Sequence, residues 1–159
     1  MVKVIVIFAS MTGNTEEMAD YIADGVREAG AELTLKSVMD VNASVMENYD
    51  GIALGAYTWG DGDLPDEFLD FYEEMDEVDL TGKQAVAFGS CDSSYSEYGA
   101  AVDLLERKLE ELGAVIALPG MKVELGPSAQ EKEQLKQFGI TFVNHLRVLK
   151  EATAGGTIV

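Results

Sequence analysis

Apolar residues gather in five short runs along the chain, and the first of them, VKVIVIFA, is rich in β-branched residues. Short apolar runs of this kind, bounded by turn residues, are typical of strands buried inside a sheet. The second run is more polar than the others, so we expect its strand at an edge of the sheet. The predicted strands cover residues 2–9, 32–38, 51–57, 83–90 and 114–123, the last of them in two pieces.

Between these runs the apolar residues recur with helical spacing. Met18, Ile22 and Val26 lie four residues apart and predict one buried face of a helix over residues 14–29, with Gly30 at its end. Three more helices are predicted: one from Pro65 to about residue 75, one over about 96–112, and one that starts near Ser128. Pairs with capping-box spacing mark three helix starts: Asn14 with Glu17, Ser94 with Glu97, and Ser128 with Glu131.

The last two helices carry the clearest apolar stripes. One stripe comprises Tyr98, Ala101, Val102, Leu105, Leu109 and Leu112, and the other Leu135, Phe138, Phe142, Leu146 and Leu149. The final stretch, EATAGGTIV, has a Gly-Gly pair and little periodicity. We therefore predict a single domain over residues 1–150 and a loose tail over 151–159.

Strands that alternate with helices predict an α/β fold with a parallel sheet and helices on both of its faces. Ligands of such doubly wound sheets bind beyond the carboxyl ends of the strands, where the strand order reverses. The loops after the first, third and fourth strands are therefore the candidate site. They are SMTGNT (10–15), TWGDGDLP (58–65) and GSCDSSY (89–95).

The charge of the chain is strongly negative and unevenly spread. The 159 residues carry a net charge of −18, and residues 61–79 alone hold ten acidic side chains. This field disfavours binding to nucleic acid, whose affinity depends on Lys and Arg at phosphates. The negative charge is compatible with binding to basic protein partners. It is equally compatible with acidic residues whose only role is to keep the protein in solution. The acids do not have the spacing of an EF-hand, so we predict no metal site.

Other features exclude further classes. Cys91 is the one cysteine, so an internal disulfide is excluded. No apolar run approaches the length of a membrane span, and the N-terminus has no small-residue cleavage site of a signal peptide. We therefore expect a cytoplasmic protein without a membrane anchor.

The SMTGNT loop joins a predicted strand to a helix N-terminus. Backbone N–H groups there point outward, and the helix dipole favours an anion. Gly13 allows close approach, while Ser10, Thr12, Asn14 and Thr15 add neutral donors. The loop lacks the Lys of a Walker loop and the GxGxxG pattern, so a phosphate monoester fits it better than a nucleoside triphosphate or a dinucleotide. A capped helix without a ligand is the alternative.

Two aromatic residues lie in the other two loops. Trp59 stands among glycines and acids, so we expect its ring to be partly exposed. Tyr95 follows the next strand, and together the two rings could sandwich a flat heterocycle. For Tyr95 alone, a surface position near a helix start would be the favoured interpretation.

The three loops together resemble those of flavodoxins, small electron-transfer proteins that bind FMN. The matching residues are Ser10, Thr12, Gly13 and Thr15 in the first loop, Thr58, Trp59, Gly60 and Asp61 in the second, and Asp92, Ser93, Ser94 and Tyr95 in the third. The resemblance runs along nearly the whole chain and implies the strand order 2-1-3-4-5. The uninterrupted stretch from Ala114 to Val123 resembles the short-chain group of the family.

The resemblance also implies a role for each loop. The side chains named in SMTGNT, with backbone amides including those of Met11 and Gly13, would hold the FMN phosphate. Trp59 and Tyr95 would flank the flavin ring, with Tyr57 and Thr58 beside them. The backbone of Ser90, Cys91 and Asp92 would reach the pyrimidine edge, and the Gly60-Asp61 peptide would offer a carbonyl to the flavin N5–H. Cys91 stands where some relatives have Gly; we favour a buried apolar filler over a redox thiol.

The expected function is that of a low-potential one-electron carrier rather than an enzyme, shuttling FMN between semiquinone and hydroquinone. Acids near the ring would oppose an anionic hydroquinone. Partners implied by the family are a flavodoxin or ferredoxin reductase as donor and acceptor oxidoreductases, bound transiently by a monomer. The alternative is an FMN-dependent NAD(P)H:quinone-type reductase, although no acid–base centre is evident and His145 lies far along the chain from the loops. A signalling receiver is disfavoured because strand one ends in Ala9-Ser10 and strand three in Ala56-Tyr57.

Overall fold

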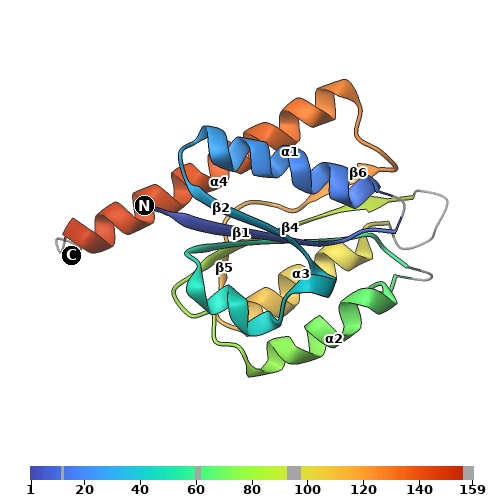
Figure 1. The fold of residues 1–159 in the computed structure, drawn as a ribbon, viewed down its shortest axis with the longest axis horizontal. Coiled ribbons are helices and arrows are strands. Elements are labelled where there is room, and N and C mark those ends of the chain that lie inside the picture. Colours follow the sequence, from blue (N-terminus) through green and yellow to red (C-terminus); the bar gives the residue numbers. More distant parts are fainter. Residues whose placement is uncertain (12, 60–61, 93–97, 156–159) are drawn as a thin grey trace.

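A parallel sheet with the strand order β2-β1-β3-β4-β5 forms the centre of the molecule (Figure 1). The computed structural model describes residues 1–11, 13–59, 62–92 and 98–155. In chain order the elements are β1 (Lys3–Ala9), α1 (Asn14–Glu28), β2 (Glu32–Ser37), β3 (Gly51–Ala56), α2 (Asp66–Glu74), β4 (Gln84–Cys91), α3 (Ala100–Glu111), β5 (Val115–Ile116), β6 (Met121–Glu124) and α4 (Ala129–Gly155). Three 3₁₀ turns accompany them: η1 (Val38–Asp40), η2 (Ala43–Asn48) and η3 (Met75–Glu77).

The fifth strand is divided as the sequence predicts. β5 pairs with the start of β4 at Gln84 and Ala85, and β6 pairs with its end from Phe88 to Cys91. Both pieces run parallel to β4 along the same edge. The predicted order 2-1-3-4-5 is therefore confirmed, with β2 at the opposite edge.

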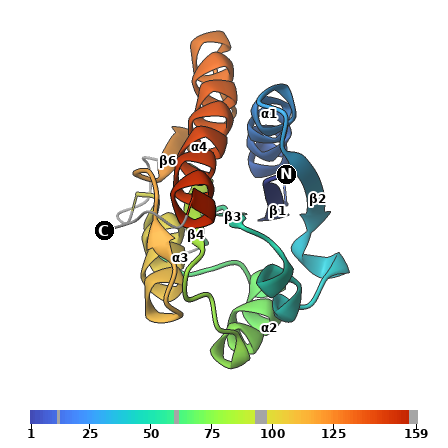
Figure 2. The same ribbon diagram turned by 90° about the vertical axis from the view of Figure 1, so that its left-hand side faces the viewer.

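Helices cover both faces of the sheet, as Figures 1 and 2 show: α1 and α4 lie on one side, α2 and α3 on the other. β1 supplies both cores because its side chains alternate between the two faces. Val4 and Val6 pack with the α1–α4 layer, while Ile5 and Ile7 pack with the α2–α3 layer. The buried face predicted for the first helix is confirmed, since Met18, Ile22 and Val26 have no exposed surface.

Some local predictions differ from the structure. The expected Asn14–Glu17 capping box is absent: Gly13 occupies the N-cap position and no side chain caps the helix. Reciprocal bonds do form at α4, where Ser128 N donates to Glu131 Oε1 (2.9 Å) and Glu131 N donates to Ser128 Oγ (3.2 Å). The pair Ser94 and Glu97 lies outside the described residues. Tyr98 and Leu149, placed in buried stripes by their spacing, are exposed because each stands at or beyond the end of the sheet-facing part of its helix.

Helix α4 continues to Gly155, five residues into the segment predicted as a loose tail. Figure 1 shows this end of the helix projecting past the sheet. Extending an existing helix adds one hydrogen bond for each residue that is fixed, so it needs no packed face. Residues 156–159 lie outside the described part of the chain. Among the described residues, no helix is both long enough and apolar enough to cross a bilayer.

Candidate functional site

The loops after β1, β3 and β4 meet at the carboxyl edge of the sheet around two adjoining hollows. The hollows share Met11, Tyr57 and Trp59. One of them is also lined by the predicted site residues Asn14, Thr58, Ser90, Cys91 and Asp92. The structure thus brings together residues from all three predicted loops. Thr12, Gly60, Asp61 and Tyr95 lie outside the described residues.

The first loop is tied to the end of β4 through a buried hydroxyl. Thr15 is 1% exposed, and its Oγ1 lies 2.9 Å from Ser90 Oγ. The Ser90 backbone N–H also donates to Thr15 Oγ1 at 3.4 Å. The start of α1 is therefore fixed to the end of β4, where the backbone of Ser90 was predicted to bind the pyrimidine edge of the flavin.

The turn into α1 leaves open space beside its backbone. Gly13 has φ +90°, a left-handed conformation that favours glycine, and a Cβ at this position would meet nothing within 4 Å. Its N–H donates to Ser10 Oγ at 3.1 Å, and its carbonyl accepts the first helical bond from Glu17 N at 2.9 Å. The backbone N–H groups of the first turn of α1 point out of the helix at its N-terminus, where the helix dipole is positive. Such an end can hold an anion close to the main chain.

Trp59 stands at the rim of both hollows and is 48% exposed, as its polar neighbours predict. Its backbone is paired with that of Asp63: Trp59 N donates to Asp63 O and Asp63 N donates to Trp59 O, both at 2.8 Å. The Tyr57 ring contacts it edge-on, with ring centroids 6.4 Å apart. The pairing with Asp63 and the contact with the tyrosine ring together position Trp59 beside the hollow.

Tyr57 and Glu67 form a polar pair under this rim. Burial, reinforced by the adjacent Glu67 carboxylate, raises the pKa of Tyr57 to about 12. One oxygen of that carboxylate, Oε1, is buried and has no hydrogen-bond partner among the described residues. Sequence reasoning did not identify Glu67 or its neighbour Asp66 as lining residues, because it treated both only as part of the acidic stretch.

The end of β4 supplies the opposite wall. Cys91 is buried, and burial raises the pKa of its thiol to about 11 although Lys122 opposes the shift. The thiol is therefore protonated at neutral pH, which agrees with a filler and not with a reactive thiol. Cys91 O accepts a bond from Leu125 N at 2.8 Å. Lys122, the cation nearest this wall in the described residues, is paired with Asp103 at 3.0 Å.

Leu125 is a lining residue that the sequence reasoning missed. It follows β6, is exposed, and has φ +55°, which is uncommon for a residue other than glycine. The only available signal was its position, since the Leu-Gly-Pro turn also follows a strand at the carboxyl edge of the sheet. That loop was left out of the predicted site.

These features fit FMN, the group that the sequence resemblance implies. A helix N-terminus with neutral hydroxyl donors suits a phosphate monoester, and an exposed indole beside an open hollow suits a flat ring. Among the described residues, no three His, Cys, Asp or Glu side chains gather as a metal site would require.

Comparison with known proteins agrees with this geometry. The family model of flavodoxins matches residues 6–139. A probable flavodoxin 2 of Bacillus subtilis is 48% identical over 143 residues, which cover 89% of this chain and 95% of the relative. A flavodoxin of Maridesulfovibrio salexigens is 37% identical over 82% of this chain and 92% of its own length. The crystal structure of oxidised flavodoxin 1 from Bacillus cereus superposes with a TM-score of 0.88 at 59% identity, covering 90% of this chain and 98% of that one. The chain therefore belongs to the flavodoxin family of FMN-binding electron-transfer proteins.

Proposed function

We propose that this protein is a low-potential one-electron carrier, with FMN bound without a covalent link, that passes electrons from a reductase to acceptor redox enzymes. The observation that carries the proposal is the hollow between the Trp59 rim and the end of β4, which adjoins a helix N-terminus built from neutral donors. When bound, FMN supplies the electron transfer, and the protein positions the flavin and sets its potential.

The roles proposed for the site residues follow the two ends of the hollow. The phosphate would be held by the side chains of Ser10, Thr12, Asn14 and Thr15 and by backbone amides that include those of Met11 and Gly13. Trp59 and Tyr95 would flank the ring, next to Tyr57 and Thr58. The backbone of Ser90, Cys91 and Asp92 would bind the pyrimidine edge, and the carbonyl of the Gly60-Asp61 peptide would accept a hydrogen bond from the flavin N5–H. The Thr15–Ser90 contact supports this arrangement because it sets the spacing between the two ends.

Charge at the site supports a low potential. Asp66 and Glu67 line the hollow on the Trp59 side, and one oxygen of Glu67 is buried with no hydrogen-bond partner in the described part of the chain. The nearby cation Lys122 is paired with Asp103, so its charge is largely compensated. Negative charges that are poorly compensated oppose the addition of further negative charge nearby. The second electron should therefore be harder to add than the first.

We further propose that the protein acts as a cytoplasmic monomer, with a flavodoxin or ferredoxin reductase as donor. The acidic stretch after β3 supports transient, electrostatic contacts with basic partners. The carrier, and not an NAD(P)H:quinone-type reductase, is the favoured function because none of the described lining residues is a histidine or lysine poised for acid–base work.

A redox titration of the FMN-loaded protein tests this function. Two separate one-electron steps, with a paramagnetic species at half reduction, are expected. A single two-electron step would contradict the proposal. Steady oxidation of NAD(P)H by the pure protein with a quinone, and without an added reductase, would favour the enzyme instead.

A further inference from the structure

A groove runs between α2 and α3, directly beside Trp59. Its apolar lining includes Trp59, Leu69, Tyr72 and Leu104, and the acidic residues Asp63 and Asp66 also line it. Leu69 is 43% exposed although it lies on the helix that packs Phe68 and Phe71 into the core. We call this feature the α2–α3 groove. It shares Trp59 with both hollows of the candidate site and Asp66 with one of them, but none of its lining residues comes from β4 or from the loop before α1.

The walls of the groove are held together by a lysine. Lys108 of α3 is buried, and its Nζ lies 4.8 Å from the centroid of the Tyr72 ring on α2. The same ammonium group is paired with Asp76 in η3. A cation that bridges two elements in this way restricts their relative movement. The groove is therefore preformed, which lowers the entropic cost of binding a partner.

The negative charge around the groove favours a partner with positive charge. The segment Asp66–Glu77, which forms α2 and η3, contains seven acidic residues and no Lys or Arg. Lys108, a cation that faces this segment, is already paired with Asp76. A surface with an apolar centre and an acidic surround complements one with a basic surround and a projecting apolar side chain.

We propose that the α2–α3 groove is the docking site for a basic segment of a protein partner, which inserts one large apolar side chain between Leu69 and Leu104. This inference rests on the proposed function and identifies where the partner binds. Because Trp59 borders both the groove and the flavin hollow, a segment seated there lies next to the electron-transfer site. Long-range attraction by the acids would speed encounter, while one shallow apolar contact would keep the complex short-lived.

The test uses two amphipathic helical peptides that carry lysines on one face and differ at one central residue, Leu in one and Ser in the other. Each is titrated into isotopically labelled, FMN-loaded protein and followed by amide chemical shifts. We expect the Leu peptide to shift resonances of α2 and α3 around the groove. It should bind roughly fivefold more tightly than the Ser peptide because a half-buried leucine is lost in the exchange.

Variants of the protein complete the test. Leu69→Ser should weaken binding of the Leu peptide roughly fivefold and remove its advantage over the Ser peptide. The matched control is Val148→Ser, since Val148 is 68% exposed on α4, on the other face of the sheet, and this change should leave binding unaltered. Neither variant should change FMN affinity or the redox titration.

Four outcomes would overturn the proposal. The two peptides could bind equally well, which would mean attraction by acids alone. The shifts could fall on α4, or Leu69→Ser could bind like the unaltered protein. Shifts of the groove resonances with protein concentration alone would instead assign the groove to a second copy of the chain. The peptides carry no redox group, so these results are independent of whether the one-electron titration succeeds.

Discussion

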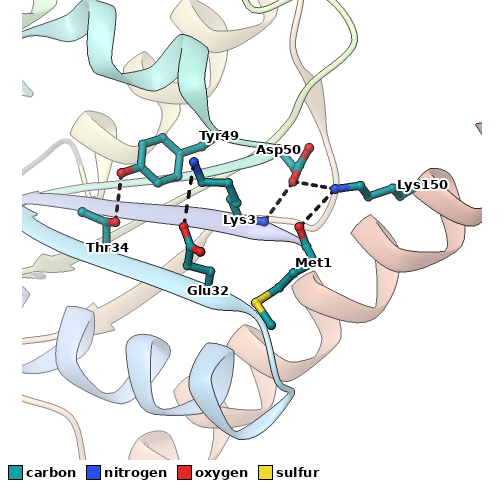
Figure 3. A network of polar contacts seen from close by, with 7 residues as sticks. All are labelled: Met1, Lys3, Glu32, Thr34, Tyr49, Asp50 and Lys150. Atoms are coloured by element: carbon teal, nitrogen blue, oxygen red, sulfur yellow. Dashed lines mark hydrogen bonds and ion pairs between the residues drawn. The ribbon is translucent and has the colours of Figure 1, made fainter.

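At the amino end of the sheet, charged side chains from several elements are joined to one another (Figure 3). Lys3 N donates to Asp50 Oδ2 at 2.9 Å, and Lys150 Nζ of α4 reaches both Asp50 Oδ2 (3.4 Å) and Met1 O (3.1 Å). At the carboxyl end, by contrast, Trp59 is exposed, Leu125 adopts a left-handed conformation, and one carboxylate oxygen of Glu67 is buried with no hydrogen-bond partner among the described residues. The exposed aromatic ring and the strained backbone therefore occur at the end of the sheet that was predicted to bind the ligand.

The two ends differ less in the number of unpaired groups than in their charge. Two buried side-chain oxygens without partners are found in the described residues: Glu67 Oε1 at the carboxyl end and Gln84 Oε1 at the start of β4. An amide oxygen costs less to bury than a carboxylate. At the amino end of the sheet the unpaired oxygen thus belongs to the neutral amide of Gln84. At the end that was predicted to bind the ligand, it belongs to the carboxylate of Glu67, which lies close enough to influence a bound ligand.

Gly89→Ala should have the largest effect, because it places a Cβ 2.0 Å from the backbone oxygen of Ala56 on β3. Ala56 is paired with Ala9 of β1, so its backbone cannot easily move aside, and we expect a loss of about 3 kcal/mol or more in the free energy of unfolding. Gly51→Ala, at the amino end, meets the ends of the Leu146 and Phe142 side chains and should cost about 1–2 kcal/mol. Urea denaturation measures both, and equal losses would contradict the distinction.

Thr15→Val keeps the shape of the side chain but leaves the buried Ser90 N–H without its acceptor and the Ser90 hydroxyl without this hydrogen-bond partner. We expect a loss of about 1–3 kcal/mol in stability and a clear loss of FMN affinity, followed by the recovery of flavin fluorescence on dilution. Ser128→Ala removes the cap of α4 and provides the control: about 1 kcal/mol of stability with no change in FMN binding. If FMN affinity responds equally to both changes, the Thr15–Ser90 contact does not organise the site.

Stability should also fall at alkaline pH through Cys91. Its pKa is raised from 9.0 to about 11 in the folded protein, so between these values the unfolded chain loses the thiol proton while the folded chain retains it. The thiol's contribution is therefore complete below pH 9.0 and disappears as the pH rises towards about 11. The stability difference between the unaltered protein and Cys91→Ala should be constant at neutral pH and shrink across this interval. A constant difference throughout would refute the shift.

The smallest effect is expected from Lys150→Met at the amino end. Both Lys150 and Asp50 are partly exposed, so the ion pair should contribute only about 0.5 kcal/mol, and less at high salt. FMN binding should not change, because the network lies at the other end of the sheet. A loss as large as that of Thr15→Val would show that the amino end matters more than its exposure suggests.

The elements that the sequence predicted well are those whose signal is local. Buried strands appear as continuous apolar runs, and the Ser128–Glu131 cap depends on residues three apart. The strand order came from the family resemblance, since periodicity does not specify which strands are neighbours. The exposure of Trp59 followed from its neighbours in the loop.

The features that were missed depend on contacts between distant segments or on backbone conformation. Asn14 has the spacing of a cap, but Gly13 in a left-handed turn takes the N-cap position. Leu125 enters the site only because β6 ends beside β4, and the pairing of Lys108 with Asp76 joins helices far apart in the chain. No local pattern encodes such contacts, whose formation depends on the packed fold.

The Thr15–Ser90 contact has a consequence for the order of events during folding. It joins residues 75 apart in the chain, and β3 lies between β1 and β4 in the sheet. The Thr15–Ser90 contact therefore cannot form until β1, β3 and β4 have assembled. Contacts of such long sequence separation form slowly. A nascent chain cannot offer the finished site until β4 has emerged from the ribosome and docked. Binding of the flavin during refolding should accordingly lag behind the formation of α1. The length of this delay would measure how long β4 takes to pair with the rest of the sheet.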